Sequence, residues 1–497
     1  MESQEETQAG AEAPTPGREA LKQGHGAGRW WQEAVFYQVY LRSFADSDGD
    51  GVGDLPGLIE KLDHLEWLGV DAVWCSPVNP SPNRDYGYDV SDYMDVEPSL
   101  GTLADLDRLI AEAGRRGIKV LLDIVPNHTS DQHPWFRDPG KRDWYVWADR
   151  PNNWMSAFGG PAWTRDEKVG RWYLHNFAPQ QPDLNWWNDE VRAEFDRILR
   201  FWFDRGVAGF RIDVASGIIK DQLLRDNPPA EPGDPWFTKR SGLRPLYNGR
   251  RPEVHDVFKR WRRITEEYEP ERVLLGETWV HDLKEWAAFY GAEGDELQLA
   301  LNFMIVFAPF EAAALRKVVE GSLAALPADA AAVWHGSNHD VSRLATRWCK
   351  GDERKVRLAL TMLLTLPGVT VLYQGDEIGL EDGPVPPERV LDVSGRDPER
   401  TPMPWSDEPN GGFTAGEPWL PLGDYRSRNV AAQRGDAGSL LNLTRELVAL
   451  KKKLRGTYEP VPAPEGSWRY RRGETAVDLD FENSRATLET LSPAAET

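Results

Sequence analysis

Short apolar runs alternate with amphipathic stretches along most of the chain. Each run is rich in β-branched and aliphatic residues at consecutive positions, as in strands that are buried on both faces of a parallel sheet. Eight such runs lie at residues 35–44, 71–78, 119–125, 207–213, 272–277, 297–305, 331–338 and 368–375. Amphipathic helical stretches separate most of them. This alternation predicts an α/β fold in which eight parallel strands close into a (β/α)8 TIM barrel.

Two long departures from this alternation predict additional structure. Residues 130–187, after the third run, are dense in Trp, Pro, Asn and Gly, which predicts a small inserted domain. The helix that completes this unit is expected at residues 188–206. Its apolar positions at helical spacing are Val191, Phe195, Ile198, Leu199 and Trp202. Residues 217–252 are polar and contain several prolines, which predicts a loop at the active face.

The two ends of the chain are expected to lie outside the barrel. Residues 1–28 are rich in Glu, Ala, Gly, Gln and Pro without an apolar segment, which predicts a disordered tail rather than a signal peptide. After a last barrel helix at residues 439–454, apolar and polar residues alternate, which predicts a short C-terminal β-rich domain. The predicted division is a tail at 1–28, the barrel at 29–129 and 188–454, the inserted domain at 130–187 and the C-terminal domain at 455–497.

Composition narrows the class of protein. The chain has 497 residues, of which 40% are hydrophobic and 28% charged, as in a globular enzyme built on one barrel with additions. No apolar segment approaches the roughly 20 residues that span a bilayer. A formal charge of −22 would repel nucleic acid and anionic lipid, so neither is expected as a partner. Cys75 and Cys349 are too few for a disulfide framework, so we expect reduced thiols and a cytoplasmic protein.

The candidate chemistry lies at the ends of the predicted strands. Carboxylates, two histidines and an arginine occur in DIVPNH at 123–128, GFRID at 209–213, GETW at 276–279 and NHD at 338–340. The C-terminal ends of the strands form the active face of such a barrel. Carboxylates gathered there fit the two-carboxylate mechanism of glycoside cleavage, in which one group attacks and another donates a proton.

Taken together and in this order, the four segments resemble the conserved regions of the alpha-amylase family of glycoside hydrolases. QPDLNWW at 181–187 and RTPMPW at 400–405 resemble markers of its oligo-1,6-glucosidase and alpha-glucosidase group. The resemblance extends over about residues 30–454. It implies a TIM-barrel hydrolase that acts on small oligosaccharides.

The resemblance also implies the catalytic roles. Asp213 corresponds to the family's nucleophile, Glu277 to its acid/base and Asp340 to a third carboxylate that binds sugar hydroxyls. Arg211 lies two residues before Asp213, so on a strand both side chains emerge on one face and we expect Arg211 to keep Asp213 ionised. Glu277 has no cation beside it in the sequence, so an apolar setting that keeps it protonated is expected.

A pocket for one terminal glucose is implied as well. The substrate-binding residues carried by the resemblance are Asp85, Tyr88, His128, Phe158, Phe177, Arg211, His339 and Arg396. In exo-acting relatives, a pair such as Asp85 and Arg396 grips the terminal sugar and closes the pocket, so that single glucose units are removed. For Phe158 and Phe177, ordinary packing is the alternative.

An acidic loop follows the first predicted strand. In DSDGDGVGD at residues 46–54, carboxylates alternate along the chain and a glycine stands at the sixth position, as in calcium loops of the EF-hand kind. The candidate ligands are Asp46, Asp48, Asp50, the Val52 carbonyl and Asp54. The loop lacks a glutamate at the twelfth position, but the oligo-1,6-glucosidase group carries a similar loop, which implies structural Ca²⁺ or Mg²⁺. A solvated acidic turn is the alternative, and no organic cofactor is expected.

The resemblance implies a retaining, exo-acting alpha-glucosidase that hydrolyses terminal non-reducing α-1,4- or α-1,6-linked glucose from short oligosaccharides. Val214, beside the nucleophile, favours α-1,6 bonds in this group, whereas the insertion at 217–252 departs from the oligo-1,6-glucosidase pattern. The alternatives are a transglucosidase or a sucrose or maltose isomerase, because a sugar hydroxyl can replace water in the second step. A non-catalytic family member is a further alternative.

Overall fold

The computed structural model describes residues 29–234 and 236–490, so the predicted tail at 1–28 lies outside the described residues. The main sheet has eight strands in the order β10-β11-β1-β2-β3-β7-β8-β9, with parallel pairing throughout. A parallel bridge from Leu301, just after β9, to Val333 in β10 joins the two edges. The predicted (β/α)8 barrel is therefore confirmed. Its strands are β1 (Val35–Val39), β2 (Ala72–Cys75), β3 (Lys119–Ile124), β7 (Gly209–Ile212), β8 (Val273–Gly276), β9 (Leu299–Ala300), β10 (Val333–His335) and β11 (Val369–Tyr373).

One predicted strand is shorter than its apolar run. Of residues 297–305, only Leu299–Ala300 pair as β9, and Phe303–Phe307 form the helix α10. The Asn302 side chain accepts a hydrogen bond from the Met304 N–H and so caps this helix. The run is apolar because both the strand and the short helix are buried. A continuous apolar run does not show by its spacing whether it forms a strand or a helix.

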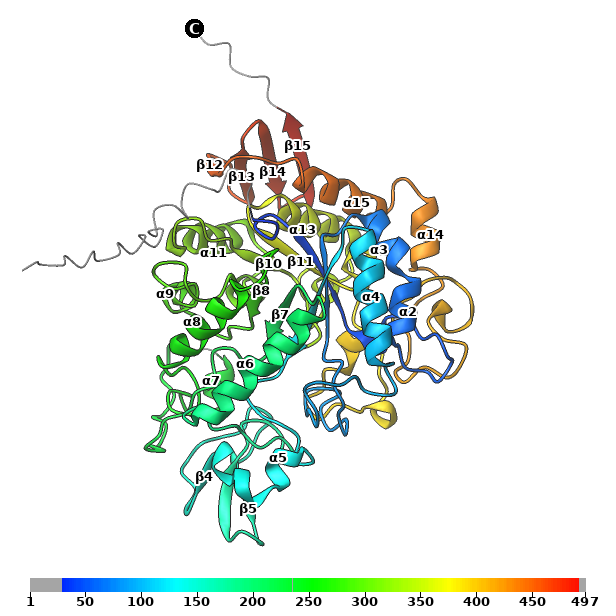
Figure 1. Cartoon of the computed structure of the whole chain (residues 1–497). Coiled ribbons are helices and arrows are strands. Elements are labelled where there is room, and N and C mark those ends of the chain that lie inside the picture. The colour runs from blue at the N-terminus through cyan, green and yellow to red at the C-terminus, as the bar shows by residue number, and fades with distance from the viewer. Residues whose placement is uncertain (1–28, 235, 491–497) are drawn as a thin grey trace, which may run out of the picture.

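Helices cover the outside of the barrel (Figure 1). The predicted helix at 188–206 is α6 (Asp189–Asp204), which begins after the Asn188 cap and buries its apolar stripe. The α-helices are α2 (Leu55–Glu60), α3 (Leu62–Leu68), α4 (Leu103–Arg115), α5 (Pro134–Arg137), α6, α7 (Trp236–Ser241), α8 (Val254–Thr265), α9 (Leu283–Ala288), α10, α11 (Ala312–Ala325), α12 (Leu344–Arg347), α13 (Glu353–Thr365), α14 (Val430–Gly435) and α15 (Leu440–Lys451). The 3₁₀ turns are η1 (Leu41–Ser43), η2 (Pro139–Trp144), η3 (Asp376–Ile378), η4 (Pro387–Arg389), η5 (Asp397–Arg400) and η6 (Pro409–Gly412).

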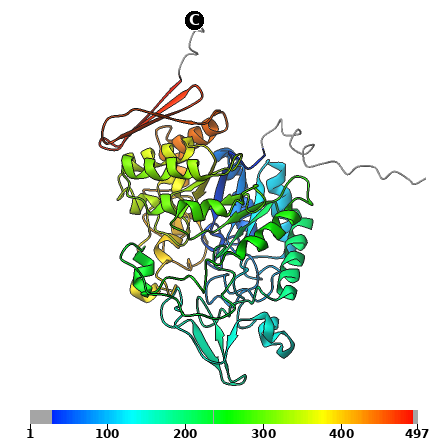
Figure 2. The same ribbon diagram turned by 90° about the vertical axis from the view of Figure 1, so that its left-hand side faces the viewer.

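The segment after β3 forms the inserted domain. Its antiparallel sheet has the order β4-β6-β5, with β4 (Trp147–Ala148), β5 (Trp163–Asp166) and β6 (Arg171–Leu174). The domain has a small apolar core of its own, which consists of Ala148, Trp154, Ala162, Trp163 and Leu174. Because it follows the C-terminal end of β3, it lies over the end of the barrel where the strands finish (Figures 1 and 2).

A second antiparallel sheet covers the opposite end of the barrel (Figures 1 and 2). Its strands are β12 (Tyr458–Val461), β13 (Ser467–Arg472), β14 (Thr475–Asp480) and β15 (Arg485–Thr490). Trp468 and Val477 belong to the main apolar core. Tyr470 Oη lies 2.6 Å from Thr365 Oγ1 at the end of α13, and Arg472 forms an ion pair of 2.9 Å with Glu33. The sheet therefore packs directly on the barrel and shares its apolar core.

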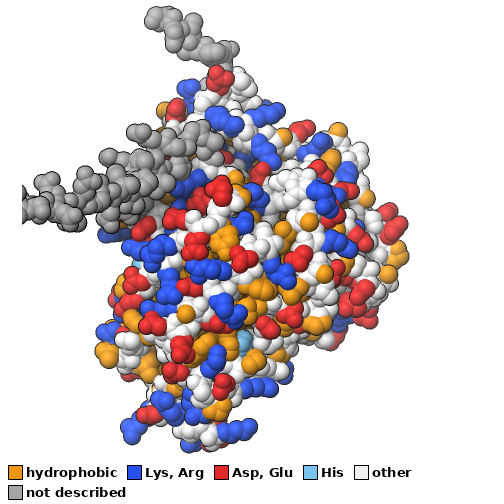
Figure 3. All heavy atoms as spheres, viewed as in Figure 1, with side chains coloured by type: hydrophobic (Ala, Val, Ile, Leu, Met, Phe, Trp, Pro, Cys, Tyr) orange, Lys and Arg blue, Asp and Glu red, His pale blue; other side chains and the backbone are white. Residues whose placement is uncertain are grey.

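Three features concern the expected partners and compartment: the apolarity of the helices, the surface charge and the state of the cysteines. In the described part of the chain, no helix combines the length and apolarity that crossing a bilayer requires. Figure 3 shows acidic and basic side chains interspersed on one face, without a continuous basic patch. Cys75 and Cys349 are both buried and form no disulfide.

Candidate active site

The candidate residues converge at the barrel end that faces the inserted domain. Asp123 lies in β3, Arg211 in β7 and Asp213 just after β7. Glu277 follows β8 directly, and Asp340 lies in the loop after β10. All five side chains are largely buried, so their polar groups must find partners among one another.

Arg211 lies at the centre of these carboxylates. Its Nη1 atom lies 2.9 Å from Asp123 Oδ1 and 2.8 Å from Asp213 Oδ1. Its Nη2 atom lies 2.8 Å from Glu277 Oε1. The guanidinium is completely buried, and its planar fork allows these ion pairs in fixed directions. One cation is thus shared by three carboxylates.

This sharing changes the expected charge of Asp213. Burial raises the pKa of Asp213 well above its ordinary value, and Glu277 and Asp123 raise it further against the opposing effect of Arg211. Burial also raises the pKa of Asp123 to about 7. Arg211 therefore favours the ionised form of Asp213, as predicted, but does not outweigh burial. Because three carboxylates surround one guanidinium, we expect the cluster to retain a shared proton near neutral pH.

Glu277 lies in a more polar setting than the sequence predicted. Besides Arg211, it accepts hydrogen bonds from the Val214 N–H at 2.8 Å and the Trp279 indole at 2.7 Å. Val214 has a φ of 49°, a left-handed conformation that is rare for a β-branched residue. The apolar setting expected for Glu277 is not found, because β8 pairs with β7, which brings Arg211 beside Glu277.

Asp340 is held by two further arginines. Its Oδ1 atom lies 2.8 Å from Arg396 Nη1 and 2.9 Å from Arg400 Nη2, and its Oδ2 atom lies 3.2 Å from His339 Nε2. Burial opposes ionisation, but His339, Arg396 and Arg400 lower the pKa of Asp340 well below its ordinary value. Asp340 is therefore a carboxylate at neutral pH, in contrast to the cluster around Arg211.

The predicted pair of Asp85 and Arg396 is formed. Arg396 Nη2 lies 2.7 Å from Asp85 Oδ1 and 2.6 Å from Asp392 Oδ1. Asp392 also accepts from Arg396 Nε at 3.1 Å, and is buried. Arg396 consequently joins Asp85, Asp340 and Asp392, which come from three separate loops.

Sequence reasoning missed two residues of this network, Asp392 and Arg400. They stand four residues before and after Arg396, so a helical spacing around that arginine was an available signal. Arg400 is completely buried and also donates from Nε to the His339 carbonyl at 2.7 Å. Both residues fix the position of groups that the sequence did predict.

Tyr88 and His339 form a stacked pair next to the carboxylates. Their rings lie 5.4 Å apart at an interplanar angle of 6°. Tyr88 Oη donates to Asp123 Oδ2 at 2.9 Å and lies 2.6 Å from His339 Nε2. Gln38 Nε2 lies 2.7 Å from His339 Nδ1. Burial lowers the pKa of His339 well below its ordinary value, so the imidazole is neutral.

The remaining candidates lie along the inserted domain. His128 Nε2 lies 3.1 Å from the Tyr88 carbonyl oxygen, and the His128 ring lies 5.1 Å from that of Phe177. Phe177 meets Phe158 edge to face at 5.5 Å, and the Arg396 guanidinium lies 5.3 Å from the Phe158 ring. The two phenylalanines thus contact residues on both sides of the candidate glucose pocket.

The acidic loop brings together part of its predicted metal site. Carboxylate oxygens of Asp46, Asp48 and Asp50 lie within 4.8 Å of one another. Asp54 has another contact: it accepts hydrogen bonds from the Gly57 N–H, as the cap of α2, and from Ser47. The three carboxylates are an all-oxygen donor set, which suits Ca²⁺ or Mg²⁺, and the predicted Val52 carbonyl follows them in the same loop.

Fold and geometry together define a catalytic domain with a carboxylate site at the open end of an eight-stranded barrel. The chain belongs to the alpha-amylase family: the sequence model of that family, "Alpha amylase, catalytic domain", matches residues 38–458.

Individual relatives extend this similarity over most of the chain. A probable alpha-glucosidase of Rhizobium meliloti is 41% identical, covering 85% of this chain and 82% of the relative. An oligo-1,6-glucosidase of Parageobacillus thermoglucosidasius is 38% identical, covering 86% of this chain and 85% of the relative. Among solved structures, the alpha-glucosyl transfer enzyme XgtA has a TM-score of 0.86 and 40% identity, over 91% of both chains. The trehalulose synthase MutB of Pseudomonas mesoacidophila has a TM-score of 0.84 and 32% identity, over 92% of this chain and 91% of its own.

Proposed function

We propose that this chain is a retaining, exo-acting alpha-glucosidase that releases terminal non-reducing glucose from short α-linked oligosaccharides. The observation that carries the proposal is Arg396, which joins Asp85 and Asp340 beside the cluster around Arg211. A closed set of polar groups next to the reacting carboxylates suits the end of a sugar chain. The names of the relatives, alpha-glucosidase and oligo-1,6-glucosidase, support the same activity.

The proposed reaction uses two carboxyl groups in turn. Asp213, once ionised, attacks the anomeric carbon, while protonated Glu277 gives its proton to the departing glycosidic oxygen. Glu277 then takes a proton from water, which attacks the same carbon and releases Asp213. The Arg211 guanidinium pairs with both groups, so whichever of them is ionised during the reaction keeps a cationic partner.

The assignment of Asp213 is tested by assaying the wild-type chain and Asp213→Asn on maltose, isomaltose, sucrose and trehalose. Released glucose and new sugars are separated by chromatography. We expect glucose formation by the wild type and a loss of roughly 10³-fold or more in the variant. Asp407→Asn, at an exposed position, is the matched control. A wild-type chain inactive on all four sugars, or an active Asp213→Asn, would contradict the proposal.

Transfer to a sugar hydroxyl is the second candidate function. Both XgtA, described as an alpha-glucosyl transfer enzyme, and the trehalulose synthase have TM-scores of at least 0.84 to this chain. A glycosyl-enzyme can react with a hydroxyl group of a sugar in place of water. Accumulation of new disaccharides in the same assay, instead of free glucose, would assign the chain to this class.

The preferred linkage depends on the leaving-group side of the site, where Val214 follows the nucleophile. We propose that Val214 favours α-1,6 bonds, as in the oligo-1,6-glucosidase group. A higher kcat/KM for isomaltose than for maltose is expected, and Val214→Ala should shift the ratio towards maltose. If the ratio already favours maltose in the wild type, the neighbouring residues 217–252 determine the linkage instead.

We further propose a structural Ca²⁺ or Mg²⁺ in the acidic loop and a cytoplasmic location. The metal is supported by the three converging carboxylates and by the all-oxygen donor set. The location is supported by two buried cysteines that form no disulfide. Metal analysis of the purified chain and fractionation of the host cell test these two points.

A further inference from the structure

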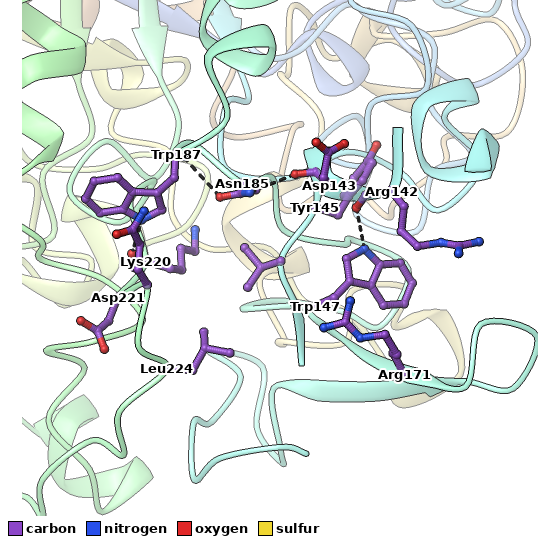
Figure 4. A pocket seen from close by; sticks show the side chains of 12 residues that line it. Arg142, Asp143, Tyr145, Trp147, Arg171, Asn185, Trp187, Lys220, Asp221 and Leu224 are labelled. Carbon is purple, nitrogen blue, oxygen red and sulfur yellow. Dashed lines mark hydrogen bonds between the residues drawn. The ribbon is translucent and has the colours of Figure 1, made fainter. Parts of the chain in front are cut away.

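A cavity lies between the inserted domain and residues 220–224, which follow β7 (Figure 4). Its volume of about 520 Å³ falls within the range of about 300–1,000 Å³ that is typical of small-molecule sites. It is lined by Arg142, Asp143, Tyr145, Val146, Trp147, Arg171, Asn185, Trp187, Lys220, Asp221, Gln222 and Leu224. Within the described ranges, none of these side chains is hydrogen-bonded or ion-paired to Asp213, Glu277 or Asp340.

A buried polar wall separates this cavity from the proposed glucose pocket. Lys220 Nζ lies 2.9 Å from Asp183 Oδ2 and donates to Asn127 Oδ1. Asn127 Nδ2 in turn lies 3.0 Å from His128 Nδ1, which belongs to the pocket side. Lys220 thus connects the lining of the cavity, through Asn127, to His128, a candidate residue of the glucose pocket.

Two tryptophans lie on opposite sides of the cavity (Figure 4). The Trp147 indole N–H donates to the Arg142 carbonyl at 2.8 Å, and the Trp187 indole N–H donates to the Lys220 carbonyl at 2.8 Å. One face of Trp147 stacks on Phe136 at 5.9 Å and 4°. Both rings are half-buried, so each polar edge is fixed while apolar ring surface stays accessible. They are rigid, flat platforms for a ligand with an apolar face.

The charges around the cavity are largely neutralised by local partners. Lys220 pairs with Asp183, Arg171 pairs with Asp149 at 2.8 Å, and Asp221 pairs with Arg225. An anionic ligand would thus find few unpaired cations here.

Two polar side chains of the lining are available to a ligand. Arg142 and Gln222 are exposed, and in the part of the chain that the structure describes neither side chain has a hydrogen bond or ion pair. The Asn185 side chain already donates a hydrogen bond to the Asp143 carbonyl, which holds these two lining residues together. Fixed aromatic faces, neutralised charges and free donors suit an uncharged ligand with many hydroxyl groups.

We propose that this cavity is an accessory carbohydrate-binding site, which holds a glucose-containing oligosaccharide between Trp147 and Trp187. Sugar rings have apolar faces that pack on indoles and hydroxyl rims that pair with groups such as Arg142 and Gln222. The ligand class rests on the proposed function, since an enzyme of oligosaccharides meets such chains at high local concentration. Binding here keeps a substrate chain close to the hydrogen-bonded network of Lys220, Asn127 and His128.

The test is a calorimetric titration of the full-length Asp213→Asn chain with maltotriose and with isomaltotriose. We expect a binding component that Trp147→Ala weakens by about tenfold, as expected when a stacking ring is removed. The double variant Arg142→Ala/Gln222→Ala should weaken the same component, and it changes exposed side chains without partners, so the fold is preserved. Trp67→Ala, a partly buried tryptophan of α3 on the outer surface, is the control and should change nothing.

The outcomes separate this proposal from the proposed function. If no binding component responds to either Trp147→Ala or the double variant, the accessory site is refuted. Hydrolysis of maltose by the wild-type chain is measured independently. A chain that lacks hydrolysis but retains a Trp147-dependent component would refute the alpha-glucosidase and leave the carbohydrate site standing.

Discussion

Arg211 links the protonation states of the proposed catalytic carboxyl groups. Because its guanidinium contacts Asp123, Asp213 and Glu277, a proton gained by one of them strengthens its pairing with the other two. The three carboxyl groups therefore share one cationic partner. Asp340 does not belong to this group, since Arg396 and Arg400 hold it as a carboxylate.

The raised pKa of Asp213 predicts a shifted acid limb of activity. The nucleophile must be ionised, so kcat/KM is lost as pH falls through its raised pKa, which lies well above the ordinary value of about 3.9. The measurement is kcat/KM for maltose, which does not titrate, between pH 3 and pH 8. Circular dichroism at each pH serves as the control for folding. An acid limb at or below about pH 4 would contradict the burial-raised pKa.

Asp392 is predicted to act as a positioning residue for Arg396. In Asp392→Asn, the ion pair at 2.6 Å is lost and Arg396 is free to leave Asp85. We expect KM for maltose to rise by about tenfold, which corresponds to about 1.4 kcal/mol, with a smaller fall in kcat. Steady-state kinetics and the melting temperature are measured together.

The matched control for this variant is Val393→Ala, a 74% exposed side chain in the same segment. It should leave both KM and kcat unchanged. A fall in melting temperature without a change in KM would assign Asp392 a purely structural role.

How far residues could be predicted depended on their separation along the chain. The pairing of Arg211 with Asp213 follows from the two-residue period of a strand. The pairing of Asp85 with Arg396 spans 311 residues and was reached only through the family resemblance. The pairing of Glu277 with Arg211 was missed, because it depends on which strands are neighbours in the closed sheet.

At the scale of elements, the acidic loop is held at both ends by a distant segment. Asp46 N–H donates to the Phe413 carbonyl at 2.9 Å, and Trp419 N–H donates to the Gly51 carbonyl at 3.0 Å. Gly51 has a φ of 93°, and an added Cβ there would lie 1.9 Å from the Glu417 carbonyl oxygen. The loop thus has to keep glycine at this position, and its backbone contacts hold the carboxylates close together despite their mutual repulsion.

Metal removal is therefore predicted to destabilise this region. Treatment with a chelator should lower the melting temperature, and added Ca²⁺ should restore it. An ion at 100 times its Kd raises the free energy of unfolding by about 2.7 kcal/mol. Asp48→Asn/Asp50→Asn should melt at one temperature with or without Ca²⁺. Glu465→Gln, an exposed acidic position elsewhere, is the control and should retain the response. Equal melting of the wild type with and without metal would favour a solvated acidic turn.

Among the elements, long periodic segments were predictable and short ones were not. The helix α6 was predicted with its apolar stripe because sixteen residues contain several turns of the pattern. The run at 297–305 divided into a two-residue strand and the helix α10, since both are buried and the Asn302 cap fixes the boundary. The C-terminal strands were predicted from alternation, but not the side of the barrel on which they pack.

At the scale of the whole molecule, the inserted domain and the C-terminal sheet differ in the apolar core on which they pack. The inserted domain has a separate core around Trp154 and Trp163. The C-terminal sheet contributes Trp468, Val477 and Leu479 to the main core. Burial of these side chains couples the C-terminal sheet to the barrel. The strands β5 and β6 rest instead on the smaller separate core, so we expect this part of the inserted domain to open locally.

Native-state hydrogen exchange is expected to show this difference. Amide protons of β13 and β14 should exchange only through global unfolding, with the same denaturant dependence as β1 and β11. Amide protons of β5 and β6 should exchange through a smaller opening, with a weaker dependence on denaturant. The measurement is exchange followed by mass spectrometry at increasing denaturant. Identical behaviour of both sheets would contradict the separation of the two cores.

The ion pair between Glu33, just before β1, and Arg472 in β13 lies at one end of the barrel. The inserted domain and the carboxylates lie at the other end (Figures 1 and 2). A chain attached to a solid support, or fused to another protein, near either of these strands would therefore turn its open face away from the attachment point. Immobilisation through this end should leave access for sugars unobstructed.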